Sequence, residues 1–336
     1  MSAVLPAAPL LQVDDLHKHY PVRGGFWART IGTVRAVAGV SFSLAAGQTL
    51  GLVGESGCGK STLGRTLMRL EEPTAGRVQF DGRDLAHARG AELQRLRREI
   101  QMIFQDPYSS LNPRLTVGEI VREPLLVHGI GGRAGQLERV RSVLEKVGLA
   151  ADAMDRYPSE FSGGQRQRIG VARALALEPR LVIADEPVSA LDVSVQSQVL
   201  NLMVRLQREM GLAYLFISHD LSVVEHVSDH VAIMYLGRIV EYGPADRIFG
   251  RPAHPYTRAL LQAVPSIDPH RRREAPPLQG EAPSPTAAAP GCVFASRCPL
   301  VKDACRAEPP SLQPAGGAEP DPRREHRVAC IRRDEI

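Results

Sequence analysis

A glycine-rich loop at residues 54–61, Gly-Glu-Ser-Gly-Cys-Gly-Lys-Ser, constrains the fold of this chain more than any other feature. It has the GxxxxGK[ST] form, follows an apolar strand-like run at 49–53 and precedes a helix predicted from Thr62 to Leu70. Its glycines allow positive φ, so that successive N–H groups and the helix N-terminus point at phosphate oxygens. Lys60 then reaches the β- and γ-phosphates of a nucleotide, and the Ser61 hydroxyl holds Mg²⁺. The predicted nucleotide contacts are Gly54, Glu55, Ser56, Gly57, Cys58, Gly59, Lys60, Ser61 and Thr62.

Two adjacent carboxylates follow a second apolar run. Leu181–Ala184 is short and continuously apolar, as expected of a buried parallel strand, and it leads into Asp185 and Glu186. Ligands of open α/β sheets bind at the carboxyl ends of the strands, which positions Asp185 to hold the hydration shell of Mg²⁺ and Glu186 to activate the attacking water. Alone, the pair is more simply a solvated strand end. Together with the glycine-rich loop, it predicts hydrolysis as well as binding.

A third segment indicates the family. Residues 161–168 read Phe-Ser-Gly-Gly-Gln-Arg-Gln-Arg and lead into a predicted helix over 169–176. This segment closely resembles the signature of ABC transporter ATPases. The other elements of that family stand in the expected order, with Gln105 as the Q-loop, Ser189–Asp192 as the D-loop and His219 as the switch histidine. Each has an ordinary structural explanation by itself, but the order and spacing of five elements favour the family.

The resemblance implies that two such domains work as a pair. A serine and glycine amides at a helix N-terminus can bind a γ-phosphate, yet the loop at 54–61 already covers the nucleotide of its own chain. The signature is therefore implied to close over ATP held by a second subunit, and hydrolysis to release the pair. The residues implied to contact that second nucleotide are Ser162, Gly163, Gly164, Gln165 and Asp192.

Three further residues take roles only from the resemblance. Gln105 is implied to reach the Mg²⁺. His219 is implied to position the γ-phosphate and to report its loss, which makes it catalytic alongside Glu186. Tyr20 matches the aromatic residue that stacks on adenine in this family; a strand tyrosine packed on the core explains it equally well.

Composition agrees with a soluble protein of this class. The 336 residues, 43% of them apolar, suffice for one substantial core and a smaller appendage. No stretch approaches about 18 consecutive apolar residues, and Met1–Leu11 lacks the basic region and cleavage pattern of a secretion signal. We therefore expect a cytosolic protein that does not span a membrane. A net charge of +4 argues against nucleic-acid binding, while the surplus of Arg suits contact with an anionic inner leaflet.

Changes of pattern divide the chain. Residues 10–50 and 76–104 alternate apolar and polar residues and predict an antiparallel β subdomain, whereas 106–172 is mostly helical. Residues 173–245 return to strand and helix in alternation. The predicted fold class is α/β: a P-loop NTPase core of the ABC ATPase type with an antiparallel β subdomain, a helical subdomain and a C-terminal loop-rich extension. The predicted domains are 10–250 for nucleotide binding and 251–336 for the extension.

Beyond Gly250 the composition changes. Seven prolines lie between Pro265 and Pro290, which favours an extended or loop-like tail. The segments His254–Leu261, Gly280–Pro285 and Gly291–Pro299 resemble parts of the ATP-binding subunits of bacterial oligopeptide and dipeptide importers. From about residue 10 onward, the whole chain resembles the second ATPase subunit of a dipeptide importer.

This second resemblance implies ATP-driven import of dipeptides or oligopeptides. The implied partners are a paralogous ATPase subunit, two transmembrane permease subunits and, through the permeases, an external peptide-binding protein. The chain is then peripheral, on the cytoplasmic face of the inner membrane. Because such partners select the cargo, nickel or another small solute stays open.

Two other classes of ABC ATPase are less consistent with the sequence. Soluble members that act on DNA or ribosomes carry long coiled coils or two ATPase halves, and this chain shows neither. Exporter ATPases are usually fused to membrane helices or lack the tail that begins at His254.

Four of the five cysteines lie in the tail, at Cys292, Cys298, Cys305 and Cys330. Disulfides are not expected in a reducing cytosol, and thiols clustered in a segment with little core suggest a metal site. The CxxC pairs of zinc ribbons are absent, whereas Cys298-Pro299 is similar to a cluster-ligating cysteine followed by proline. The prediction is a structural [4Fe-4S] cluster, with Zn²⁺ or free thiols as alternatives. Cys58 is interpreted as a small space-filling residue whose oxidation could inactivate the loop.

Overall fold

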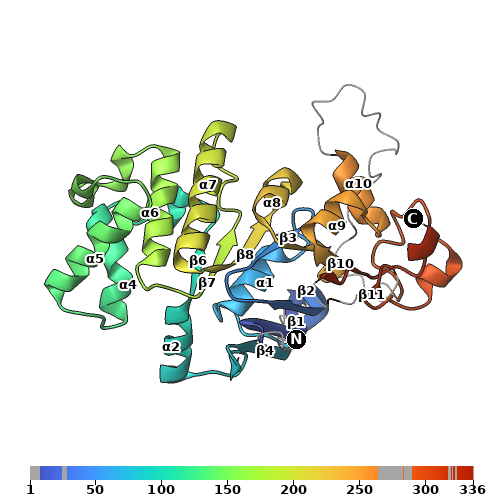
Figure 1. The fold of residues 1–336 in the computed structure, drawn as a ribbon. Helices are drawn as coiled ribbons and strands as arrows, with labels where there is room; N and C mark the ends of the chain where they lie inside the picture. The colour runs from blue at the N-terminus through green and yellow to red at the C-terminus, as the bar shows by residue number, and fades with distance from the viewer. Residues whose placement is uncertain are drawn as a thin grey trace, which may run out of the picture.

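The computed structural model of the chain describes residues 8–24, 29–263, 283, 290–316, 319, 321 and 324–335. A sheet of eight strands runs through the molecule, and a second sheet of four strands lies beside it (Figure 1). Helices from the middle of the chain gather at one end, and the C-terminal segments gather at the other (Figure 1). The predicted α/β fold class, with its additional β and helical parts, is confirmed.

The eight-stranded sheet contains the parallel core. In spatial order its strands are β11 (Gln313–Pro314), β12 (Arg327–Val328), β10 (Arg238–Pro244), β9 (His230–Tyr235), β3 (Thr49–Val53), β8 (Ala213–Ser218), β7 (Leu181–Asp185) and β6 (Ile100–Ile103). The five strands from β9 to β6 pair in parallel, and β10 and β12 are antiparallel additions. Because β3 lies between β9 and β8, the loop after β3 opens beside strand ends that come from far along the chain.

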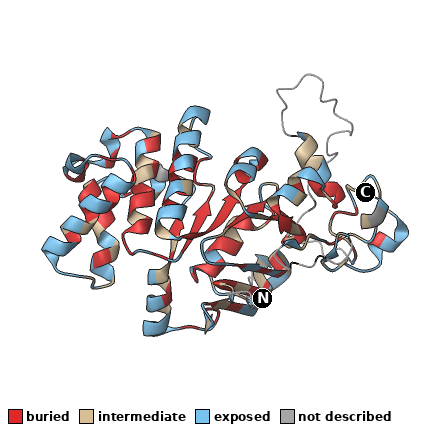
Figure 2. Cartoon of the chain, in the orientation of Figure 1, coloured by how far each residue is buried: buried red, intermediate tan, exposed pale blue. Residues whose placement is uncertain are grey.

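The central strands are covered on both faces. Strands β3, β7 and β8 are buried along their whole length. In β7, Val182 and Ala184 belong to one hydrophobic core, and Leu181 and Ile183 belong to the other. Figure 2 shows these buried strands between helices whose outer faces are exposed. A strand buried on both faces needs apolar residues at every position, which is why continuous apolar runs predicted these strands.

The smaller sheet is antiparallel. Its order is β2 (Arg29–Leu44), β1 (Leu11–Gly24), β4 (Ala75–Phe80) and β5 (Arg83–Asp84). The predicted antiparallel region is therefore confirmed for these strands. The prediction is wrong for its last part, because α2 (Gly90–Glu99) is a helix and β6 joins the parallel sheet. Leu93 and Leu96 pack on the core from one helix face, so their spacing of three residues was a helical signal.

Helices connect the strands and cover the large sheet. They are α1 (Lys60–Leu67), α3 (Pro107–Ser110), α4 (Val117–Val127), α5 (Arg133–Lys146), α6 (Gly163–Leu175), α7 (Val193–Met210), α8 (Leu221–Val227), α9 (Ala245–Gly250) and α10 (Pro255–Ala263), with 3₁₀ turns at Ala151–Asp155, Pro158–Glu160, Asp303–Arg306 and Arg333–Glu335. The segment predicted to be mostly helical contains α3 to α6. Helix α1 begins at Lys60, two residues before the predicted start. None of the helices that the structure describes is both long and apolar enough to cross a bilayer.

The described part of the tail packs on the core. Strand β12 pairs with β10, and Phe294 is fully buried. The wholly buried carboxylate of Glu241 accepts the N–H groups of Ala253 (2.7 Å) and His254 (3.0 Å) and lies 2.7 Å from His326 Nε2. These contacts tie two separate parts of the tail to the sheet. Residues 264–282 and 284–289, which include most of the prolines predicted to be extended, lie outside the described residues.

We expect mild acid to loosen this tail because of His254. Its imidazole is fully buried, and its Nδ1 accepts the Tyr256 N–H at 3.1 Å. Burial lowers the pKa of His254 from 6.5 to about 3, so the fold holds the neutral ring. The resulting stability is complete above pH 6.5 and is lost as the pH falls toward about 3, because the unfolded chain binds the proton first. Between pH 6.5 and 5 the loss is about 2 kcal/mol.

The substitution His254→Asn tests this contribution, since an amide oxygen replaces the Nδ1 acceptor and does not titrate. Denaturant titrations at pH 7.5 and pH 5 would give the free energy of unfolding of both proteins. We expect the wild type to lose about 2 kcal/mol more than the variant. Equal losses would show that His254 does not sense the proton.

Candidate functional site

A cleft of ≈ 590 Å³ lies beside the loop that follows β3. It is lined by eleven predicted site residues, namely Tyr20, Ser56, Gly57, Cys58, Gly59, Lys60, Ser61, Thr62, Gln105, Glu186 and His219. It is also lined by residues that the sequence did not single out, namely Val34, Arg35, Ala36, Leu236 and Gly237. The fold therefore brings the glycine-rich loop together with the Q-loop, a carboxylate from the end of β7 and the histidine after β8.

Close backbone approaches require glycine at two positions of the loop, Gly54 and Gly59, and a φ of 78° favours it at Gly57. A Cβ atom at Gly59 would lie 2.0 Å from the carbonyl oxygen of Ala36, and one at Gly54 would lie 2.1 Å from that of Met234. Gly59 also has φ of 108°, in the region that favours glycine. This tight course leaves the N-terminus of α1, with N–H groups that have no partner inside the helix, at the cleft. Such a cradle fits the phosphates of a nucleotide.

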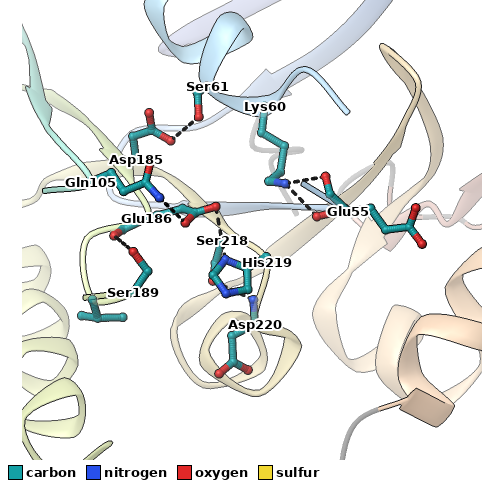
Figure 3. A network of polar contacts seen from close by, with 12 residues as sticks. Glu55, Lys60, Ser61, Gln105, Asp185, Glu186, Ser189, Ser218, His219 and Asp220 are labelled. Carbon is teal, nitrogen blue, oxygen red and sulfur yellow. Dashed lines mark hydrogen bonds and ion pairs between the residues drawn. The ribbon is translucent and has the colours of Figure 1, made fainter. Parts of the chain in front are cut away.

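The first two residues of α1 bring charge and a hydroxyl to this cradle. Lys60 is 5% exposed, and its Nζ donates to the carbonyl oxygens of Gly54 (2.7 Å) and Glu55 (3.0 Å). The Ser61 hydroxyl donates to Asp185 Oδ1 at 2.9 Å, and Figure 3 shows this pair beside Lys60. Burial raises the pKa of Asp185, against the opposing effect of the Ser61 hydrogen bond. A buried carboxylate next to a hydroxyl is a donor set that fits Mg²⁺, which prefers oxygen ligands.

Glu186 stands at the point where β7 ends. Its φ of 45° is uncommon for a residue with a side chain and costs about 1–3 kcal/mol. Its N–H donates to the Ile217 carbonyl at 2.9 Å, which fixes the turn against β8. Its Oε2 accepts from Gln105 Nε2 at 2.8 Å, and its Oε1 lies 3.2 Å from His219 Nδ1 (Figure 3). One carboxylate therefore touches both side chains that the resemblance assigns to the γ-phosphate and Mg²⁺.

Tyr20 lines the cleft and also belongs to its own sheet. It is half-buried on β1, its hydroxyl donates to Glu71, and Lys18 Nζ lies 4.9 Å from the ring centroid. The position is compatible with both explanations of this residue. Adenine stacking stays a prediction.

The signature does not line the cleft of its own chain. Neither Ser162, Gly163, Gly164, Gln165 nor Asp192 is among the described residues around the cleft. The Ser162 hydroxyl accepts the Gln165 N–H at 3.4 Å, and Gln165 Oε1 accepts the Ser162 N–H at 3.0 Å, a capping box that starts α6. Ser162 and Asp192 are exposed, and Val193 beside Asp192 is 78% exposed.

The four tail cysteines do lie around one cavity, of ≈ 20 Å³, but its lining is mainly apolar and includes Phe294 and Leu300. Burial raises the pKa of Cys292 to about 11 and also raises the pKa of Cys298 and Cys330. Desolvation, together with the neighbouring thiols, therefore disfavours the thiolate form of these cysteines in the metal-free chain.

The prediction of a [4Fe-4S] cluster on Cys292, Cys298, Cys305 and Cys330 is wrong. Among the described residues, which include all four cysteines, no group of three or more His, Cys, Asp or Glu side chains is placed to hold a metal ion. The alternative of Zn²⁺ gains no support from the same arrangement. The pattern misled because cysteine is also a small apolar residue: Cys305 is buried, and Cys292 and Cys298 pack against the larger hydrophobic core.

Sequence reasoning also missed two residues that contact the loop from the tail. Tyr256 binds the backbone N–H of Glu55, and Arg297 binds its carboxylate. Glu55 is not among the described residues that line the cleft. No local pattern connects position 55 with residues more than 200 positions later. The segment containing Tyr256 stood out in the sequence, but only by its resemblance.

Comparisons with known proteins agree with this geometry. A family model described as ABC transporter matches residues 37–189, and one described as oligopeptide/dipeptide transporter, C-terminal region, matches residues 240–305. The chain is similar to the ATP-binding cassette MJ0796, solved as a dimer in a post-hydrolysis state bound to ADP and Pi. The TM-score is 0.62 and the identity 27%, over 70% of this chain and 98% of that one.

Curated relatives are considerably closer. The chain is 57% identical to a probable peptide ABC transporter ATP-binding protein, y4tS, of Sinorhizobium fredii, over 91% of this chain and 86% of the relative. It is 55% identical to the dipeptide transport ATP-binding protein DppF of Escherichia coli, over 92% of each chain. It is 50% identical to the oligopeptide transport ATP-binding protein AppF of Bacillus subtilis, over 96% of each. With this identity over nearly its whole length, the chain belongs to the family of ABC transporter ATP-binding proteins, in the group with the oligopeptide/dipeptide C-terminal region.

Proposed function

We propose that this chain is the ATP-hydrolysing subunit of a transporter that imports dipeptides or oligopeptides. The observation that carries the proposal is the single cleft where the glycine-rich loop meets Glu186, Gln105 and His219. The names of the relatives support peptides as cargo, and the match of residues 240–305 to the C-terminal region of peptide transporters supports the same class.

Each residue of the cleft has a task in this reaction. The loop amides and Lys60 hold the phosphates, and Ser61, Asp185 and Gln105 hold Mg²⁺, which offsets phosphate charge when bound. Glu186 accepts a proton from the attacking water. His219, in contact with Glu186, orients the γ-phosphate. Tyr20, which lines the cleft, stacks on the adenine.

The partners follow from the surface of the signature. Because Ser162, at the N-terminus of α6, is exposed outside the cleft, it is free to meet a nucleotide held by another ATPase subunit. We propose a paralogous chain as that subunit, two membrane permeases that anchor the pair at the cytoplasmic face of the membrane, and an external peptide-binding protein. Residues 10–250 form the nucleotide-binding domain in this proposal, and residues 251–336 form the extension.

A tagged chain purified from its own membranes in mild detergent tests this assembly. We expect it to bring down two permeases and a second ATPase subunit. In proteoliposomes supplied with the external binding protein, the complex should transport a labelled dipeptide only when ATP is present on the side that carries the ATPase subunits. A complex carrying Glu186→Gln serves as the matched control without transport. Uptake of Ni²⁺ but not of dipeptides would contradict the proposed cargo. Full hydrolysis by the isolated monomer would contradict the pairing.

A further inference from the structure

An arginine of the extension forms an ion pair with the glycine-rich loop. Arg297 donates from Nη1 to Glu55 Oε2 at 2.8 Å and from Nη2 to Glu55 Oε1 at 3.1 Å. The arginine side chain is 8% exposed and the glutamate side chain 28%, so little water competes for the pair. Two parallel charge-assisted hydrogen bonds of this kind fix geometry as well as contribute energy. They join residues that are 242 positions apart.

Arg297 is itself held by a cluster of aromatic rings. Its Nη1 lies 3.4 Å from the Tyr235 hydroxyl, and its guanidinium lies 5.9 Å from the centroid of that ring. Tyr235 packs on Tyr256 with ring centroids 4.7 Å apart and on Phe294 with centroids 5.4 Å apart. All three rings are buried. The guanidinium is therefore presented to Glu55 from a rigid support.

The same cluster binds the backbone of Glu55. The Tyr256 hydroxyl oxygen accepts the Glu55 N–H at 2.9 Å. On the other side of the residue, the Glu55 carbonyl accepts from Lys60 Nζ at 3.0 Å. Residues of the extension thus bind the side chain and the N–H of Glu55, while the Glu55 carbonyl accepts a hydrogen bond from Lys60, which lines the cleft.

This chain of contacts bears on ATP binding. Lys60 Nζ donates hydrogen bonds to the carbonyls of Gly54 and Glu55, so these carbonyls determine the position of the ammonium group before ATP binds. A loop that is already ordered loses less conformational freedom when a ligand binds. Without the hydrogen bonds from Arg297 and Tyr256 to Glu55, the nucleotide itself would have to order the first half of the loop, which would lower its affinity.

We propose that Arg297 is a positioning residue for ATP binding, acting through Glu55 to hold the glycine-rich loop and Lys60 in their binding arrangement. Tyr256 supports the same position through the Glu55 N–H. The inference rests on the proposed binding of ATP in the cleft. It assigns to the extension a part in nucleotide affinity.

Affinity for Mg-ATP in the purified full-length chain, followed by calorimetric titration, tests this role. We expect Arg297→Met to weaken binding by about tenfold, the size of losing one strong charge-assisted contact. Arg297→Lys should fall between the variant and the wild type, because Lys retains the charge without the two-pronged geometry. Glu55→Ala should match Arg297→Met, and the double variant should bind no more weakly than either, since both remove the same contact.

Arg324→Met is the matched control. Arg324 also joins the tail to the core, through Asp246 Oδ2 at 2.9 Å, but this pair is exposed and lies at α9. We expect its affinity for Mg-ATP to stay within about twofold of the wild type. An equal loss in Arg324→Met would assign the effect to general docking of the tail and would overturn the role of Arg297.

Tyr256→Phe provides a second route if Arg297→Met folds poorly. It keeps the packed ring and removes only the acceptor of the Glu55 N–H. A purely structural role would lower the melting temperature and leave affinity unchanged in the folded protein. Unchanged affinity in both Tyr256→Phe and Arg297→Met, or additive losses in the double variant, would overturn the inference. A wild-type chain that does not bind Mg-ATP would instead remove the proposed function.

Discussion

Replacing Lys60 with methionine is expected to weaken Mg-ATP binding by about two orders of magnitude. The Nζ is buried against the loop and faces the cleft, so a phosphate at the cradle meets it with little competing water. A charge-assisted hydrogen bond contributes about 1.5–3 kcal/mol, and the loss of one or two of them amounts to about 3 kcal/mol. That free energy corresponds to about a hundredfold in the dissociation constant.

The same titration on Arg65→Met separates this effect from a loss of positive charge on α1. Arg65 lies on the helix that begins with Lys60, but it is exposed and does not line the cleft. Its replacement should leave affinity within about twofold of the wild type. If the dissociation constant of Lys60→Met stays within threefold of the wild type, the lysine contributes only its hydrogen bonds to the carbonyls of Gly54 and Glu55 and does not bind the phosphates.

The parts of the site that the sequence predicted are those whose chemistry is local. The turn at residues 54–61 requires glycine where another backbone approaches closely, at Gly54 and Gly59, and favours it where φ is positive, at Gly57, so these requirements stay visible as a motif. The strand that precedes Asp185 is buried on both faces and therefore reads as an unbroken apolar run. Glu186 was placed at the site by the rule that ligands bind at the carboxyl ends of parallel strands, whereas Gln105 and His219 were assigned by resemblance, and the structure brings all three together.

The parts that could not be predicted depend on long-range packing. Arg297 and Glu55 are ordinary charged residues in sequence, and only the docking of the extension brings them together. Cys292 and its three partners have spacings that a metal site and a small apolar cavity share, and only the arrangement of the described side chains, which offers no metal-holding group, separates the two. Helix α2 falls in the region 76–104, which was predicted as strands from alternating apolar and polar residues, whereas Leu93 and Leu96 pack on one core from a helix.

The substitution Glu186→Gln is expected to leave Mg-ATP affinity within about threefold of the wild type and to lower the rate of hydrolysis by about 10²–10⁴-fold. The amide keeps the size of the carboxylate and can still accept from Gln105, which donates to Oε2 at 2.8 Å in the wild type. It cannot take a proton from water. Single-turnover hydrolysis, with the proposed partner ATPase subunit present as a variant that cannot hydrolyse its own ATP, measures the chemical step without product release.

Glu209→Gln, a change of the same charge at an exposed position of α7, should hydrolyse ATP at the wild-type rate. A Glu186→Gln chain that still hydrolyses ATP within tenfold of that rate would contradict its assignment as the base, and loss of ATP binding would show that the carboxylate belongs to the binding site instead.

A block at the chemical step also has a consequence for assembly. If ATP held at Lys60 and the signature of the partner close one interface, a Glu186→Gln chain should remain paired with the partner ATPase subunit as long as ATP is present, because the γ-phosphate contacts are not removed. Size-exclusion chromatography with light scattering would show the pair with Mg-ATP and separate subunits with Mg-ADP.

His219→Ala in the Glu186→Gln background should not slow hydrolysis much further, since the two side chains are in contact and act on the same step. A strongly additive loss would place His219 in a step of its own.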